Sequence, residues 1–550
     1  MNRKVLVAAA WPYVNGSLHL GHVAALLPAD IIARYHRAKG DKVLYVSGSD
    51  CHGTPILVTA ELEGRTPEEV AGRYHDEIVR TLIDQLRFSY SLYSKTMGAF
   101  HKGVAQEVFT KLYADGYMTA HEEQQAYCST CTRSLPDRFI EGICPKCSRR
   151  GARGDQCDSC GHLHTPSELI EPRCRTCGTT PVWKPSTHLY LRLPMFQDRL
   201  AMWTNATQKN WRENAVSVTK GWLAKGLEER PITRDLSWGI PVPVNGFTEK
   251  CMYVWFEAVI GYYSCSREWA TLQGTPDAWR EWWENPDALH YYVHGKDNIP
   301  FHTIIWPTML MALGLHLPDR IVSSEFLNFG GVKLSKSQNI GIWLPQALAK
   351  FDPDAIRFYL TANGPETRDS IFHWRDFEHR VNGDLIGNFS NFLHRTFSMT
   401  NRYFGVIPAT GTASEECVEL RAAIVTTFEE VGVCIEQLEF RRALFSILAL
   451  SRQANVYLER RGPWKRIEND RAHVAETLSV CMEVTDALRR LAAPFLPGVV
   501  ERLNAYLGTT DMRWKCSPLA VGTPIAQPTP LLRKVESAMI NAEIQLSEEV

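Results

Sequence analysis

The start of the chain predicts a strand, a loop, a helix and a second strand. Residues 5–10 form a short apolar run, and residues 22–39 repeat apolar positions with the period of a helix that Gly40 ends. A second apolar run over residues 43–50 leads into a polar turn. Strands joined in this way are parallel, and ligands bind at their carboxyl ends.

Further along, the pattern changes character several times. A capping box at residues 66–69 opens a helix, whereas residues 118–230 show little periodicity and many cysteines, as in an insertion. Apolar and aromatic runs over residues 231–330, among them CMYVWFEAVIGYY, are interpreted as the second half of the same sheet. Long amphipathic patterns over residues 376–535 predict a helical bundle. The expected units are 1–117, 118–230, 231–330, 331–375, 376–535 and an acidic tail at 536–550.

Composition adds little to this picture. A length of 550 residues suggests several domains, and 60 basic against 61 acidic residues give a net charge of −1 that favours no partner. Binding to a nucleic acid would therefore need local basic patches. The apolar run at the N-terminus is short for a secretion signal, and no run approaches the roughly 18 residues that span a membrane. We expect a cytoplasmic protein.

The cysteines point to metal rather than to disulfides. Eight of the 15 lie between Cys128 and Cys177, all in C-x-x-C pairs, and eight thiolates suffice for two tetrahedral zinc sites. Spacing alone leaves open whether neighbouring pairs or nested pairs share an ion. The four pairs are Cys128/Cys131, Cys144/Cys147, Cys157/Cys160 and Cys174/Cys177.

Two short motifs suggest phosphate chemistry. The first is HLGH, in which His19 and His22 flank Gly21 where the first helix begins, and a helix N-terminus is a natural seat for phosphate. The second, KLSKS, places Lys333 and Lys336 in a glycine-flanked loop that can neutralise a triphosphate. Taken singly, the first motif is better explained by surface histidines near a turn, and the second by a solvated basic loop.

Together, in this order, the two motifs resemble the signature pair of class I aminoacyl-tRNA synthetases. Longer stretches resemble the methionyl-tRNA synthetase family from about residue 4 to at least 465, among them AAAWPYVNGSLHLGH, SGSDCHGTPI and VHGKDNIPFHTIIWP. The resemblance implies an α/β Rossmann-like class I catalytic domain with a zinc-knuckle insertion, followed by a C-terminal all-α anticodon-binding helix bundle. It also implies ATP-dependent ligation of methionine to tRNA.

The resemblance assigns roles to matching residues. His19, Gly21 and His22 would bind ATP, Lys333 and Lys336 would act on its phosphates, and Asp50 would pair with the amino group of methionine. Aromatic rings suit a polarizable thioether. The residues expected to line the side-chain pocket are Tyr13, Trp255, Ala258, Tyr262 and His302. Those expected to hold the adenylate are Arg234 and Asp297. Trp11 and Val259 depart from the family pattern beside this pocket, which puts its fine shape in doubt.

The resemblance also groups the cysteines. Cys144, Cys147, Cys157 and Cys160 resemble the family's zinc knuckle, and the outer pairs would form a second site around it. Without an open coordination position, both ions would be structural. The insertion is also too short for the editing domain of leucyl, isoleucyl or valyl enzymes.

In the helical region, the resemblance places Asn391, Arg395 and Trp464 at the anticodon, with Asn388 nearby. Aromatic and guanidinium planes stack on unpaired bases, although capping and core packing are the alternative. The implied ligands are methionine, ATP with Mg²⁺, two Zn²⁺ ions and tRNA(Met), including the initiator tRNA, and a monomer is expected. Three alternatives remain: a class I enzyme for another amino acid, a paralogue with altered inhibitor sensitivity, and a non-catalytic zinc protein that binds tRNA.

Overall fold

A computed structural model describes residues 3–548, except 155, 158, 161, 163, 331, 334–340, 412–413 and 517–518. The centre of the molecule is a five-stranded sheet in the order β14-β13-β1-β2-β3, with every neighbouring pair parallel. Its strands are β1 (Lys4–Ala9), β2 (Lys42–Ser49), β3 (Leu92–Lys95), β13 (Leu289–Gly295) and β14 (Arg320–Ser324).

Alternating side chains of β1 enter two different cores. Val5, Val7 and Ala9 pack with α1 (Leu20–Lys39) on one face, whereas Leu6 and Ala8 pack with α7 (Val254–Leu272) on the other. This alternation follows from the two-residue period of a strand, and apolar residues on both faces mark a buried parallel sheet. The predicted first strand, helix and second strand are therefore confirmed.

The expectation that residues 251–263 belong to the sheet was wrong. Only Cys251–Met252 forms a strand, β12, which pairs with β11 (Thr233–Arg234) outside the main sheet, and α7 begins at Val254. Most of the first turns of α7 are buried, so the segment is apolar on nearly every side and lacks a readable period. The runs over 289–295 and 320–324 do join the sheet, as β13 and β14.

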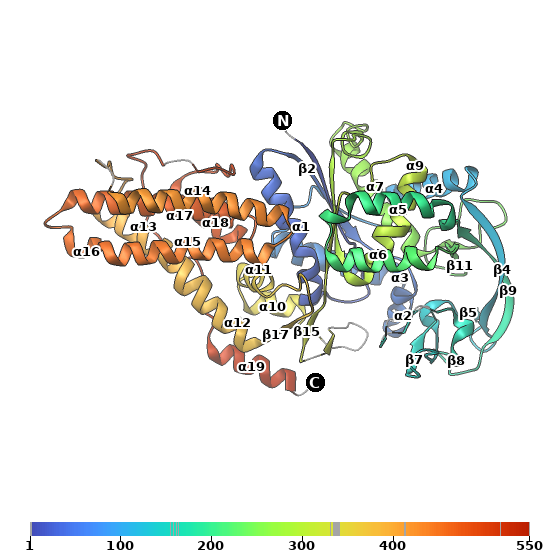
Figure 1. The fold of residues 1–550 in the computed structure, drawn as a ribbon. Helices are drawn as coiled ribbons and strands as arrows, with labels where there is room; N and C mark the ends of the chain where they lie inside the picture. Colours follow the sequence, from blue (N-terminus) through green and yellow to red (C-terminus); the bar gives the residue numbers. More distant parts are fainter. Residues whose placement is uncertain are drawn as a thin grey trace.

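The cysteine-rich insertion extends from the main domain as a long two-stranded ribbon (Figure 1). β4 (Met118–Cys128) pairs antiparallel with β9 (Val182–Leu191), and a small second sheet has the order β7-β6-β8. The helices α5 (Gln197–Thr207) and α6 (Glu213–Lys225) instead return to the core beside α7. The remaining strands of this region are β5 (Arg133–Ser134), β6 (Ile140–Ile143), β7 (Arg150–Arg153), β8 (Ile170–Cys174) and β10 (Arg230–Pro231).

The C-terminal part is helical, as predicted. Three long helices, α14 (Glu415–Glu436), α15 (Phe440–Arg461) and α17 (Arg471–Ala492), lie side by side and extend away from the sheet, with α16 (Pro463–Arg466) at their far end (Figure 1). Residues 536–550, expected as an acidic tail, contain a helix, α19 (Ser537–Glu548), which packs on α12 (Trp374–Arg380) because Ile540 is buried there.

The remaining elements connect these parts. Thr66 caps α3 through the predicted capping box with Glu69. Among the described residues, no helix is both long enough and apolar enough to cross a membrane. The other helices and strands are α2 (Thr54–Glu63), α3 (Pro67–Val79), α4 (Ala99–Ala114), α8 (Arg280–Trp283), α9 (Trp306–Leu313), α10 (Leu344–Lys350), α11 (Pro353–Ala362), α13 (Asn391–Tyr403), α18 (Pro497–Leu507), β15 (Leu327–Phe329), β16 (Val332–Lys333) and β17 (Ser370–Phe372).

Candidate active site and metal-binding insertion

The candidate active site begins where the central strand β1 ends. The chain there continues along the end of β2: the Asp50 N–H donates to the Pro12 carbonyl (2.9 Å), and the Val14 N–H donates to the Asp50 carbonyl (3.1 Å). Tyr13 and Asp50 face each other in an isolated bridge. The strand order reverses at β1, which is the position at which open α/β sheets bind ligands.

The two predicted ATP-binding histidines lie at the N-terminus of α1. His19 is the N-cap residue, and its N–H donates to Nδ1 of His22 (3.2 Å). The two rings lie 3.8 Å apart between centroids. The positive end of the helix dipole makes this terminus suitable for a phosphate group.

The second phosphate motif is only partly described. Lys336 lies in 334–340, outside the described residues, and Lys333 is described by its backbone, which ends β16. The chain beyond this motif returns to the first one, where the Leu20 N–H donates to the Ile342 carbonyl (3.0 Å). Tertiary pairing thus anchors the chain that follows the second motif beside the first.

The predicted side-chain pocket is assembled around α7. The Trp255 ring stacks on Phe301, with 4.3 Å between centroids and 12° between planes, and meets Tyr13 edge-on at 5.8 Å. Ala258, on the same helix, is half-buried. These rings offer an apolar, polarizable surface next to Asp50, which suits an amino acid with a thioether side chain.

Two further residues predicted for this pocket, Tyr262 and His302, form a buried pair. The Nδ1–H of His302 donates to the Asn298 carbonyl (2.9 Å), so Nε2 accepts the hydrogen bond of the Tyr262 hydroxyl (2.8 Å). Burial lowers the pKa of His302 to about 4, and the ring stacks on His294 at 4.2 Å. The histidine is therefore neutral at physiological pH.

Asp50 is the predicted ligand of the amino group, and its surroundings disfavour its charge. It is 3% exposed, and burial, followed by the nearby carboxylate of Glu257, raises its pKa well above the usual range. The His52 N–H, at 3.4 Å, is a weak compensating donor. A buried carboxylate held in this way attracts a cationic group strongly.

The two residues predicted to hold the adenylate lie on separate elements. The Arg234 guanidinium, on β11, lies 3.9 Å from the centroid of the Tyr253 ring and donates to the Thr233 carbonyl (3.0 Å). Asp297 lies in a short 3₁₀ turn that follows β13 directly. Asp297 is thus placed at the carboxyl edge of the sheet by the strand before it.

Trp11, one of the departures from the family pattern, fits because two glycines make room for its ring. A Cβ atom at Gly48 would lie 2.5 Å from Cζ3 of Trp11, and one at Gly261 would lie 2.8 Å from Cε2. Val259, the other departure, is buried in the core between α7 and the sheet. The indole therefore takes space that side chains at positions 48 and 261 would need.

We expect Gly48→Ala to lower the free energy of unfolding by about 1–3 kcal/mol, the usual cost of overpacking a core. The new methyl group would also lie 2.6 Å from the Ser94 carbonyl oxygen, which belongs to the backbone and cannot turn away. Urea unfolding would measure the change. The control is Gly221→Ala on α6, where nothing lies within 4 Å, and a helical alanine should stabilise by roughly 0.5–1 kcal/mol. Equal stability of Gly48→Ala and the parent would refute this packing.

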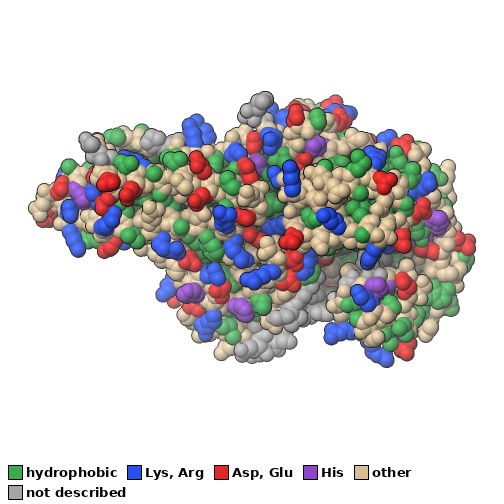
Figure 2. All heavy atoms as spheres, in the orientation of Figure 1, with side chains coloured by type: hydrophobic (Ala, Val, Ile, Leu, Met, Phe, Trp, Pro, Cys, Tyr) green, Lys and Arg blue, Asp and Glu red, His purple; other side chains and the backbone are tan. Residues whose placement is uncertain are grey.

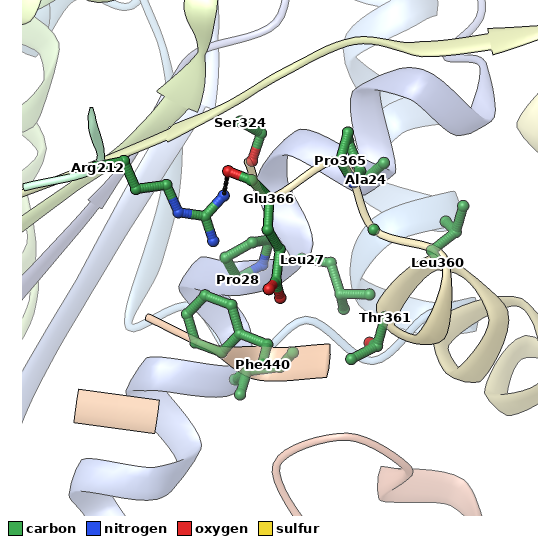
Figure 3. Close-up of a pocket in the computed structure, with 12 residues that line it drawn as sticks. Ala24, Leu27, Pro28, Arg212, Ser324, Leu360, Thr361, Pro365, Glu366 and Phe440 are labelled. Atoms are coloured by element: carbon green, nitrogen blue, oxygen red, sulfur yellow. Dashed lines mark hydrogen bonds between the residues drawn. The ribbon is translucent and has the colours of Figure 1, made fainter. Parts of the chain in front are cut away.

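A cavity of about 20 Å³ lies apart from these residues, between α1, α11 and the start of α15 (Figure 3). It has room for little more than one water molecule. Arg212 reaches across it and donates to the carbonyls of Glu366 (3.0 Å) and Leu438 (3.1 Å), beside the Phe440 ring. These bonds connect the catalytic and helical parts, and the cavity is too small for a substrate.

The eight predicted cysteine ligands form two clusters of four. Within each cluster, all Sγ atoms lie within 4.8 Å of one another. Four thiolates around one Zn²⁺ would lie about 3.8 Å apart at the usual Zn–S distance. The Sγ–Sγ distances include Cys128/Cys177 (3.4 Å), Cys131/Cys174 (3.9 Å), Cys144/Cys160 (3.8 Å) and Cys147/Cys157 (3.7 Å). The nested grouping is therefore confirmed, and the grouping of neighbouring pairs is excluded.

The predicted anticodon residues lie far from this site, towards the far end of the helices (Figure 1). The Arg395 guanidinium lies 5.2 Å from the centroid of the half-buried Trp464 ring and contacts Glu459 at 3.1 Å. Asn391 is exposed on α13. Asn388 instead donates to the Leu448 carbonyl (3.0 Å), a helix-packing contact.

The surface of the helical part carries a mixture of charges (Figure 2). Lysine and arginine side chains lie among aspartate and glutamate side chains on the face that the figure shows, rather than in one basic field. Attraction of a nucleic acid to this face would therefore depend on individual cations rather than on one extended field.

Several residues at the site were not assigned a role from the sequence. Phe301 stacks on Trp255, and a buried group formed by His52, Glu257 and His101 lies next to Asp50. His52 and Glu257 stand inside stretches that resemble the family, and a glutamate in an apolar helix is itself a signal. His101 had no such signal, because only the tertiary fold brings α4 to α7.

A parallel sheet that carries the HLGH motif at its switch point, followed by a helical domain, defines a class I aminoacyl-tRNA synthetase. The family model described as "tRNA synthetases class I (M)" matches residues 5–397, and the "Anticodon binding domain of methionyl tRNA ligase" matches residues 407–543. The chain belongs to the methionyl-tRNA synthetase family.

Individual relatives agree over the whole length. The chain is 44% identical to the methionine–tRNA ligase of Roseiflexus castenholzii and 43% identical to one from Bacillus cereus, with 98% of each chain covered in both cases. The fold resembles that of Mycobacterium tuberculosis methionyl-tRNA synthetase in complex with methionyl-adenylate, with a TM-score of 0.79 at 24% identity. That match covers 96% of this chain and 99% of the other. A class I enzyme for another amino acid is therefore excluded.

Proposed function

We propose that this methionine–tRNA ligase activates methionine at the end of β1, with Asp50 holding the amino group and the aromatic pocket holding the thioether. The observation that carries the proposal is the buried carboxylate of Asp50 beside the stacked Trp255 and Phe301 rings. An amino acid needs both an anionic site and a pocket for its side chain, and these lie together next to the helix terminus that bears His19.

The reaction has two steps. A carboxylate oxygen of methionine attacks the α-phosphorus of ATP in line, the bond to the bridging oxygen breaks, and pyrophosphate leaves. A hydroxyl group of the terminal ribose of the tRNA then attacks the acyl carbon of the adenylate, and AMP leaves. His19, His22, Lys333 and Lys336 stabilise the phosphate charge, and Mg²⁺ accompanies ATP, so positioning and charge neutralisation supply the rate. Arg234 and Asp297 hold the adenylate between the steps.

At the other end of the molecule, we assign the anticodon to the surface around Trp464. The indole would stack on an unpaired base, while Arg395 and Asn391 would contact neighbouring groups. The salt bridge between Arg395 and Glu459 is half-exposed and weak, so a nucleotide can replace it. The initiator tRNA is included among the substrates, and the enzyme acts as a monomer.

ATP–pyrophosphate exchange on the purified chain tests the activation step. Methionine should support exchange, whereas leucine, isoleucine, valine and cysteine should not, because a neutral aromatic pocket selects by shape and polarizability. Exchange driven by another of these amino acids would overturn the assignment of the pocket.

The insertion should hold two structural zinc ions, one in each cysteine cluster. We expect Cys147→Ser and Cys131→Ser each to lower the zinc content from about two to about one ion per chain, since a serine oxygen replaces a thiolate ligand poorly. Elemental analysis of the purified protein would measure this. Cys516→Ser is the matched control, because Cys516 is exposed and belongs to neither cluster. Loss of both ions from a single variant would contradict two independent sites.

A further inference from the structure

Glu257 is a carboxylate buried in the catalytic core with no role in the reaction described above. It is 0% exposed and lies on α7, within the aromatic segment CMYVWFEAVIGYY. Each of its oxygens faces one imidazole: Oε1 lies 2.8 Å from Nδ1 of His52, and Oε2 lies 2.8 Å from Nε2 of His101. Both histidines are themselves buried, at 6% and 1% exposure.

The hydrogen bonds around His101 can hold a positive charge. When the Ser264 hydroxyl donates to the Gly261 carbonyl (3.1 Å), its oxygen can accept from Nδ1 of His101 (2.7 Å). The other ring nitrogen, Nε2, donates to the carboxylate of Glu257. An imidazole that donates through both nitrogens is an imidazolium, so this arrangement suits a cation at His101 that balances Glu257.

This balance matters because Asp50 lies next to the pair. Burial alone would raise the pKa of Glu257, but the charges and hydrogen bonds of His52 and His101 hold it at about 2. Glu257 is therefore ionised, and its charge is felt by Asp50, whose pKa is raised by burial and by Glu257. Two neighbouring buried carboxylates ionise together only when a cation compensates one of them.

The other titratable groups around the two carboxylates stay neutral. Burial raises the pKa of Cys51 to about 12 and that of Cys251 to about 11, and it raises the pKa of Tyr262 well above its usual range. The ring of Trp238, which meets His52 edge-on, and that of Trp11, near His101, carry no charge. Compensation of Glu257 therefore falls to the two histidines.

We propose that His52, Glu257 and His101 form a buried charge-balancing unit that sets the pH range over which Asp50 can ionise and pair with the amino group of methionine. The inference rests on the proposed role of Asp50. On methionine binding, Asp50 releases its proton to solvent, and the balanced unit keeps the cost of its new negative charge low. His101 and Glu257 touch no substrate and act as positioning residues for the charge of Asp50.

A purely structural role would not require this arrangement. Three ionisable groups in a core cost desolvation energy, and a well-packed apolar set is often equally stable. The carboxylate is also held by an imidazole on each of its oxygens. Three buried ionisable side chains are therefore useful at this place only if a nearby function depends on their charge.

The test is the pH profile of kcat/KM for methionine in ATP–pyrophosphate exchange. His101→Gln keeps a neutral donor towards Glu257 but removes the cation, so Asp50 should ionise less readily. We expect the acid limb of the profile to move up by about one pH unit, with KM for methionine about tenfold higher on that limb. Adding Glu257→Gln should bring the limb back to the parent position or below, because the uncompensated charge is gone.

Three controls make the result decisive. His290→Gln changes another fully buried histidine, on β13, and should leave the acid limb in place whatever it does to the melting temperature. If the double variant with His101→Gln and Glu257→Gln is as impaired as His101→Gln alone, and its acid limb is still displaced, the proposed charge-balancing unit is refuted. Asp50→Asn separates the two proposals: if it leaves KM for methionine unchanged, the proposed role of Asp50 fails instead.

Discussion

Asp50→Asn is expected to lower kcat/KM for methionine by about 100- to 1,000-fold, which corresponds to roughly 3–4 kcal/mol. Asparagine has nearly the same shape as aspartate, so the change removes a charge and little else. The ammonium group of the substrate would then enter a buried site without a counter-ion, and the cost of leaving a buried charge unpaired falls mainly on binding.

The loss should be specific to methionine. In ATP–pyrophosphate exchange, KM for methionine should rise while KM for ATP stays close to the parent value, because the HLGH motif proposed to bind ATP lies apart from Asp50, at the start of α1. Asp84→Asn, at an exposed position, is the matched control and should leave both constants unchanged. Equal losses for both substrates would place Asp50 outside the amino-acid site.

Stability should move in the opposite direction. The pKa of Asp50 is raised in the folded state, so its contribution to stability is complete below the unfolded pKa and is lost as the pH rises through the folded one. At neutral pH, Asp50→Asn should therefore melt no lower than the parent. Asp50 would thus lower the stability of the fold while serving the binding of methionine, and such a trade-off between stability and activity is common at functional sites.

Arg357→Met should lower the free energy of unfolding by about 3–5 kcal/mol, the range found when one partner of a buried ion pair is removed. Arg357 is 0% exposed and donates to Asp30 (2.7 Å) and to the carbonyls of Leu86 (3.0 Å), Pro494 (3.0 Å) and Phe495 (2.8 Å). Methionine fills a similar volume but satisfies none of these acceptors, and Asp30 stays buried.

The side chain of Arg357 joins the catalytic and helical domains, because it bonds to Asp30 in the first and to two backbone carbonyls in the second. Asp30 lies in the middle of α1, Arg357 on α11, and the two carbonyls beyond them connect α17 to α18. Loss of the contact should let the helical domain unfold separately, so two transitions should replace one in urea unfolding followed by circular dichroism. Arg442→Met provides the control, since Arg442 is 68% exposed in its pair with Glu439 and should contribute little. One unchanged transition in Arg357→Met would contradict the coupling.

The same contact predicts acid sensitivity. Burial would raise the pKa of Asp30, but Arg34, Arg357 and Ser89 hold it at about 2. Because the folded pKa lies below the unfolded one, the contribution of Asp30 is present above about pH 4 and is lost as the pH falls towards 2.

Much of this protein can be predicted from local sequence. The strand of residues 5–10, the helix that begins at HLGH and the capping box at Thr66 depend on near neighbours in the chain, so their patterns are readable. The four C-x-x-C pairs specify metal ligands because zinc chemistry leaves few alternatives at that spacing. The two phosphate motifs, together with the longer stretches around them, are also enough to indicate the family.

Only the tertiary structure decided the remaining features. Residues 254–263 are apolar on nearly every side, so their period does not distinguish a helix from a strand, and only burial on the sheet defines α7. The cysteine pairing and the contact of Ile342 with Leu20 depend on chain segments that are distant in sequence. The charge of Asp50 is decided in the same way, since Glu257 acts on it from α7, which is distant in sequence, through a low-dielectric core.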